Sequence, residues 1–164
     1  MFGVASAVIF GSLLGIVTLS VSGQPQTVDF KADLSGYQEI PAVSTAGSGS
    51  FKARLVPDKS AIEFELSYSN LEGTVERVRL HFGQRGVDGG IIANLCGTFG
   101  KPACPSNGKL TGSITASNIF GPARQGIGDG EFEEVVRAIR EGATYVNVYT
   151  TAQTAGEIRG QING

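Results

Sequence analysis

The sequence predicts an all-β fold, either an antiparallel β-sandwich or a flattened barrel, with one short amphipathic helix. Apolar residues alternate with polar residues along seven or so short segments, which is the pattern of strands with one buried face. Many of the 24 glycines gather between those segments, where turns and bulges use them. One segment, residues 131–141, changes to the spacing of a helix.

Each predicted strand has an apolar face and a polar face. The strands are residues 27–34, 51–56, 62–67, 75–82, 110–115, 145–150 and 157–162. The second and third are joined by Pro57-Asp58-Lys59-Ser60, which is turn chemistry and predicts a hairpin. The acidic residues are expected to lie on solvated strand faces.

The last two strands are joined by a short polar turn and form a closing hairpin. Alternation places Val146 and Val148 on one face and polar side chains on the other. In the second strand, Gly160 lies on the apolar face, where an added side chain is expected to overpack the core. The polar face of this hairpin is where a function could sit.

The predicted helix has an apolar stripe at positions i, i+3, i+4 and i+7, formed by Phe132, Val135, Val136 and Ile139. Asp129 is the predicted N-cap, and Gly142 is the predicted first residue after the C-terminus. Because the stripe needs a partner, the helix is expected to cover an open end or edge of the sheets.

Length and charge limit the classes of protein. A chain of 164 residues that is 41% apolar forms one domain with a real core. Its net charge is −2 and its lysines and arginines are interspersed, so no basic patch predicts nucleic-acid binding.

The N-terminal segment predicts export. Residues 2–28 carry no charge, and small residues at positions 21–23 suit cleavage before Gln24. Residues 1–23 are therefore the predicted signal peptide, and residues 24–164 the mature single domain, secreted or otherwise extracytoplasmic. The alternative is an uncleaved membrane anchor, since the uncharged stretch is long enough to span a bilayer.

The two cysteines are predicted to pair. Cys96 and Cys104 enclose a short loop that contains glycine and proline, and an exported chain favours a disulfide between them. Zinc binding by this pair alone is not expected, because a structural zinc site needs four ligands.

One group of polar residues is the candidate ligand-binding face. Arg79 and His81 share a face of one predicted strand, and Asn147 and Tyr149 share the polar face of another. The alternative is a structural network at the surface or rim, with Arg79 against Tyr149 and His81 bonded to backbone. His81 is the only histidine, and no nucleophile motif accompanies it, so no catalytic set is predicted. The glycine-rich residues 83–90 open no helix, so they are predicted to form a loop without a phosphate site.

These residues resemble a CHRD domain, the module named from chordin, over nearly all of the mature sequence. The matching motifs are Leu34-Ser35-Gly36-Tyr37-Gln38-Glu39-Ile40-Pro41, Thr45-Ala46-Gly47, His81-Phe82-Gly83, Gly86-Val87-Asp88-Gly89, residues 96–104, Gly112-Ser113-Ile114-Thr115, Gly121-Pro122, Gln125-Gly126-Ile127, Tyr145-Val146-Asn147-Val148 and residues 156–161. The resemblance implies an immunoglobulin-like or superoxide-dismutase-like β-sandwich. It also implies three histidine positions, which here are Arg79, His81 and Tyr149. Arginine cannot ligate a metal and a neutral tyrosine is a poor ligand, so a metal site of relatives is expected to be lost.

The expected function is that of an exported, non-enzymatic module for adhesion, matrix assembly or protein binding, with no cofactor. Its expected partner is an extracellular or envelope protein, or a second copy of the chain. The alternative is a copper- or zinc-dependent redox or metal-handling protein with a degenerate site at His81. A third possibility is binding of a small anion or a carbohydrate by the Arg79 face.

Overall fold

The computed structural model describes residues 3, 28–56, 58, 60–98 and 100–164. The signal-peptide prediction for residues 1–23, and its membrane-anchor alternative, lie outside the described residues apart from Gly3. Within the described part of the chain, no helix is both long and apolar enough to cross a membrane.

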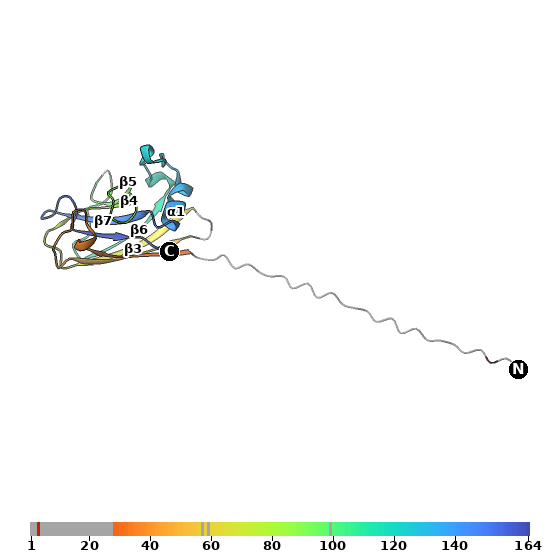
Figure 1. Cartoon of the computed structure of the whole chain (residues 1–164), viewed down its shortest axis with the longest axis horizontal. Coiled ribbons are helices and arrows are strands. Elements are labelled where there is room, and N and C mark those ends of the chain that lie inside the picture. The colour runs from red at the N-terminus through yellow and green to blue at the C-terminus, as the bar shows by residue number, and fades with distance from the viewer. Residues whose placement is uncertain (1–2, 4–27, 57, 59, 99) are drawn as a thin grey trace.

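Eight antiparallel strands form one sheet that nearly closes on itself (Figure 1). The strands are β1 (Val28–Ser35), β2 (Ser48–Leu55), β3 (Ala61–Ser69), β4 (Val75–Phe82), β5 (Gly90–Cys96), β6 (Lys109–Thr115), β7 (Thr144–Thr150) and β8 (Ile158–Gln161). Their spatial order is β5-β4-β7-β8-β1-β2-β3-β6. The two edge strands approach each other, and the backbone N–H of Phe120 donates to the carbonyl of Ile92 in β5. The all-β class is therefore confirmed.

Both predicted hairpins are present in register. In the first, Phe51 of β2 pairs with Leu66 of β3. In the second, Val146 of β7 pairs with Gly160 of β8. Strand β5 is absent from the sequence prediction because its residues are mostly buried and show no alternation of apolar and polar side chains.

The inward faces of the strands form one apolar core. Its fully buried side chains include Phe30, Phe51, Ile62, Leu66, Leu80, Val146 and Ile158. Alternation puts these residues on the inner face because successive side chains of a strand point to opposite sides.

The sheet consists of two groups of four strands that meet at a narrow seam. β5, β4, β7 and β8 form one group, and β1, β2, β3 and β6 form the other. Across the seam, Ser35 of β1 pairs with Arg159 of β8, and Lys31 forms an isolated bridge with Asn163. Few backbone pairs therefore join the two groups.

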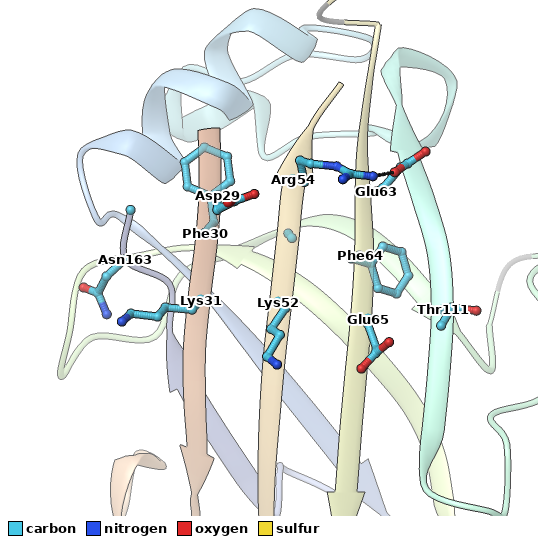
Figure 2. A pocket seen from close by; sticks show the side chains of 12 residues that line it. Asp29, Phe30, Lys31, Lys52, Arg54, Glu63, Phe64, Glu65, Thr111 and Asn163 are labelled. Carbon is cyan, nitrogen blue, oxygen red and sulfur yellow. Dashed lines mark hydrogen bonds and ion pairs between the residues drawn. The ribbon is translucent and has the colours of Figure 1, made fainter. Parts of the chain in front are cut away.

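The outer face of the second group is a shallow hollow lined by charged side chains (Figure 2). Arg54 and Glu63 form an exposed ion pair of 2.7 Å, and Lys31 lies opposite Lys52 in the register. This surface has the wet polar side chains that the alternating pattern predicts.

The predicted helix is present as α1 (Phe132–Arg140), and it closes one end of the sheet. Ile139 packs among core residues that include Phe30 and Leu80, and Val136 lies against Leu55. Figure 2 shows the helical segment lying across the ends of the strands. The expected role of covering an open end is confirmed.

The ends of α1 agree with the sequence prediction at one terminus only. Gly142 follows the C-cap residue with a φ of 64°, as predicted. The N-cap is Glu131, not Asp129 as predicted. The Glu131 side chain makes no capping hydrogen bond to the helix, and it accepts instead the backbone N–H of the preceding Gly128 at 2.6 Å.

The predicted disulfide between Cys96 and Cys104 is present. Cys96 ends strand β5 and is buried, so the bond ties the following loop to the core. Cys96→Ser is expected to lower the free energy of unfolding by about 2–3 kcal/mol, because the unfolded chain loses a closed loop. Urea unfolding measures the loss, and Cys104 should then react with thiol reagents. Labelling of both thiols in the untreated wild-type protein would contradict the pairing.

Candidate functional site

The polar face lies on the outer side of the first group of strands, opposite the core. Side chains of directly paired residues form rows across the strands. One row runs from Asn94 in β5 through Arg79 in β4 and Asn147 in β7 to Arg159 in β8. We use the name polar face for Arg77, Arg79, His81, Asn94, Tyr145, Asn147, Tyr149, Arg159 and Gln161.

The four residues that the sequence singles out come together on this face. The Tyr149 hydroxyl lies 2.9 Å from His81 Nε2, and the Arg79 guanidinium lies 5.5 Å from the centre of the Tyr149 ring. Arg79 Nε donates to Asn94 Oδ1 at 3.1 Å. Asn147 is directly opposite Arg79 in the register. The contacts of the network alternative, Arg79 against Tyr149 and His81 on backbone, are therefore both present.

His81 is a neutral side chain with both ring nitrogens engaged. Its Nδ1 lies 3.0 Å from the carbonyl oxygen of Gly89, which can only accept, so Nδ1 carries the proton. Nε2 is then unprotonated and accepts a hydrogen bond from the Tyr149 hydroxyl. Burial lowers the pKa of His81 to about 4, and the charges of Arg79 and Arg159 contribute to the lowering.

Tyr149 is held as a hydrogen-bond donor. Its ring lies between two guanidinium groups, with Arg77 at 4.5 Å and Arg79 at 5.5 Å from the ring centre. Burial raises the pKa of Tyr149 to about 12. The hydroxyl therefore keeps its proton at neutral pH and donates a hydrogen bond to His81.

Loops cover most of the polar face, so both faces of the closing hairpin are buried. Arg159 is 1% exposed, and its guanidinium lies 3.5 Å from the centre of the Tyr145 ring. It donates to the carbonyls of Val87 at 2.8 Å and Gln84 at 3.3 Å. The predicted loop is confirmed over residues 83–89, while Gly90 begins β5, and the loop folds back over β7 and β8.

Gln161 fastens the same loop from its other end. Its Nε2 donates to the carbonyl oxygens of Gly83 at 2.9 Å and Gly142 at 2.7 Å. Side chains of the polar face thus donate hydrogen bonds to backbone carbonyls of this loop. Buried backbone carbonyls need such partners.

Glu157, in the turn between β7 and β8, fastens two further segments. It is fully buried and accepts hydrogen bonds from the Thr45 hydroxyl at 2.9 Å, the Glu72 amide at 2.7 Å and the Thr150 hydroxyl at 2.7 Å. Buried carboxylates need such donors. The expectation that the acidic residues are solvated is wrong for this residue.

Glu39 is a second buried acid, and it approaches the polar face from the segment after β1. It follows the 3-10 helix η1 (Gly36–Gln38) and is 7% exposed. Its Oε2 accepts a hydrogen bond from Asn147 Nδ2 at 3.2 Å. Burial raises the pKa of Glu39 to about 7, in spite of the opposing charge of Arg159.

The arrangement does not fit a divalent metal ion. Nε2 of His81 could reach a metal only by giving up the Tyr149 hydroxyl, and the two other histidine positions implied by the resemblance hold Arg79 and Tyr149. In the described part of the chain, no three His, Cys, Asp or Glu residues are grouped as metal ligands would be. A guanidinium next to the imidazole also repels a cation.

Sequence reasoning does not assign Glu39, Tyr145, Arg159 or Gln161 to the candidate site. Alternation does place the last three on the outer side of the closing hairpin, so that signal is available. Glu39 comes from a loop more than a hundred residues away, and no local pattern marks it as buried.

The fold and the site together define a class of protein, a β-rich domain whose outer polar network fixes loops in place. The chain belongs to the CHRD domain family, since the family model matches residues 30–162. The resemblance inferred from the sequence motifs is thereby confirmed. Comparisons with curated proteins and with solved structures returned no significant match.

Proposed function

We propose that the protein is an exported, non-enzymatic binding or structural module, and that it contacts its partner through the loops above the polar face. The observation that supports this is that side chains of the polar face hold a neighbouring loop in place through hydrogen bonds. Its donors hold loop 83–89, whose outer side carries exposed residues. These exposed residues and Tyr37 of the neighbouring segment form one surface. We call it the loop end, and it consists of Tyr37, Gln84, Arg85, Val87 and Asp88.

The loop end exposes two large apolar side chains, and a hydrogen bond joins its two segments. Tyr37 is 74% exposed and Val87 is 43% exposed, although large apolar side chains are usually buried. Gln38 accepts a hydrogen bond from Arg85 at 3.1 Å and donates to the Asp33 carbonyl at 2.7 Å. Tyrosine and arginine on a preorganised loop are the residue types that dominate binding energy at protein interfaces.

The proposed partner is an extracellular or cell-envelope protein, or a second copy of this chain. Within the described residues, Arg85 forms no ion pair with a carboxylate, so its charge is available to an acidic group of the partner.

Substitution of the loop end tests this function. A Tyr37→Ser, Val87→Ser double variant is expected to weaken binding to an envelope or culture-medium protein, or self-association, by about tenfold or more. The measurements are retention on the immobilised mature protein and sedimentation for self-association. The control is Lys52→Ala, Glu65→Ala in the hollow of Figure 2, which should bind as the wild type does. Equal loss in both variants, or no partner and no self-association, would contradict the proposal.

The remaining expectations are proposals of narrower scope. We propose that the nearly closed sheet is a flattened sandwich of the immunoglobulin-like or superoxide-dismutase-like type.

Ligand binding by Arg79, His81, Asn147 and Tyr149 would use chiefly Arg79, since the other three are buried. Copper or zinc handling at His81 has no supporting contact, and metal analysis of the native protein is its direct test.

A further inference from the structure

Two buried oxygen atoms beside the polar face have no hydrogen-bond partner. They are Oε1 of Glu39 and Oδ1 of Asn147. The two residues are 7% and 4% exposed, so water does not readily reach them. Each unpaired buried acceptor is a substantial cost to the folded state.

The two oxygens converge on one point. Each lies 2.7 Å from the position that a Cβ atom on Gly156 would occupy. On the other side of the same pair, Asn147 Nδ2 already donates to Glu39 Oε2 at 3.2 Å. One hydrogen bond therefore joins the carboxyl and the amide, and the remaining oxygen of each group lies against Gly156 without a donor.

A proton supplies the missing donor without needing space. A metal ion would need room and further ligands, but Gly156 lies directly against both oxygens. Its φ of 130° also keeps other residue types from this position. A protonated carboxyl, by contrast, has one O–H to donate, and Asn147 Oδ1 is an acceptor.

We propose that Glu39 is protonated in the folded protein and donates its Oε1–H to Asn147 Oδ1, which closes a pair of hydrogen bonds between a carboxylic acid and an amide. This pair clasps the segment that carries Tyr37 onto strand β7. Ionisation of Glu39 removes one of the two hydrogen bonds and buries a negative charge. The clasp therefore weakens as the pH rises.

The groups that face Glu39 come from three elements. Arg159 of β8 favours the ionised form, and Asp88 of loop 83–89 opposes it. From β7, Asn147 bonds the carboxyl, and the neutral hydroxyls of Tyr145 and Tyr149 lie within electrostatic range. The backbone amide of Ile40 also favours ionisation. Burial outweighs the favourable contacts and raises the pKa of Glu39 to about 7.

The sign of the pH dependence follows from the proton count. Between the ordinary pKa of 4.5 and the folded-state pKa of about 7, the folded protein holds a proton on Glu39 that the unfolded chain has lost. The contribution of Glu39 to stability is therefore complete below about pH 4.5 and is lost as the pH rises to about 7.

His81 has the opposite sign in an overlapping range. Its pKa is lowered from 6.5 to about 4, so the unfolded chain holds the extra proton and stability rises with pH across that window. In the wild-type protein, the loss of stability with rising pH at Glu39 and the gain at His81 offset each other. Replacing either residue should reveal the pH dependence of stability that the other one causes.

Glu39→Gln tests the proposal, since a glutamine amide donates to Asn147 at every pH. We expect the folding equilibrium constant of the variant, divided by that of the wild type, to rise at least tenfold between pH 4.5 and pH 8. The upper limit is about 300-fold, as set by the difference between the two pKa values. Urea unfolding measures the ratio. Glu65→Gln, an exposed acid on β3, is the matched control and should not reproduce the rise expected for Glu39→Gln, because its carboxyl is not buried against an amide.

An NMR titration of the Glu39 carboxyl carbon in the wild-type protein needs no variant. A midpoint near pH 7 supports the clasp, and a midpoint near the ordinary 4.5 overturns it. A variant ratio that stays constant with pH would also overturn it. Neither measurement uses a binding partner, so failure here is distinct from failure of the proposed binding function.

Discussion

Arg159→Ala is expected to lower the free energy of unfolding by about 3–5 kcal/mol, the loss associated with breaking a buried charged network. The guanidinium is 1% exposed, stacks 3.5 Å from the centre of the Tyr145 ring and donates to two loop carbonyls. Its removal leaves a cavity and takes the side-chain donor from both carbonyls, so that the carbonyl of Gln84 keeps only the backbone N–H of Val87 at 3.2 Å. The middle of loop 83–89 should then loosen, because no other described side chain bonds those two carbonyls, while Gln161 and His81 still hold its two ends.

Urea unfolding and amide exchange of loop 83–89 measure this effect. Arg159→Lys should show an intermediate loss, since an ammonium keeps the charge but not the planar stacking surface or the donor fork. The control is Arg137→Ala, whose side chain is 67% exposed and pairs with Glu134 on the helix surface. That variant should change stability by less than about 0.5 kcal/mol. Similar losses in both alanine variants would show that the buried network does not hold the loop.

Gly160→Val is expected to be the second most damaging change, with a loss of about 3 kcal/mol or more in the free energy of unfolding. A Cβ on Gly160 would lie 2.7 Å from the carbonyl oxygen of Asp33 and 2.9 Å from Leu34 Cγ. The Asp33 oxygen belongs to the backbone of β1, so it cannot rotate away. The sequence prediction that a side chain here overpacks the core thus has a specific steric cause.

Gly160→Ala should cost less than the valine variant, about 1–3 kcal/mol, since only one carbon is added. Gly128→Ala is the matched control, because its nearest neighbour would be 3.5 Å away and its φ is not in the left-handed region. Thermal unfolding of the three variants beside the wild type ranks them. A Gly160→Ala protein as stable as the Gly128→Ala protein would show that β1 and β8 can separate without cost.

Local patterns in the sequence predict most of the strands, and the exception is informative. Residues such as Phe51 and Val146 are found by alternation because one face of their strands is polar. β5 is mostly buried along its length, so its side chains carry no contrast between faces. A period-two pattern is visible only where a strand separates core from something polar.

The candidate site is predicted only in part, for a related reason. Arg79, His81, Asn147 and Tyr149 can be grouped because they repeat at every second position of two strands. Alternation shows that a face is polar, but it cannot show whether water or a loop lies against it. The burial of Glu39 depends on a contact with Asn147 across 108 residues, and long-range closure of this kind leaves no local signal.

The narrow seam between β8 and β1 has a mechanical consequence. One ladder pair, Ser35 with Arg159, and one bridge, Lys31 with Asn163, are the backbone pairings that cross it in the described residues. A shearing load between the two halves of the sheet is therefore resisted by side-chain packing more than by rows of hydrogen bonds between peptide groups.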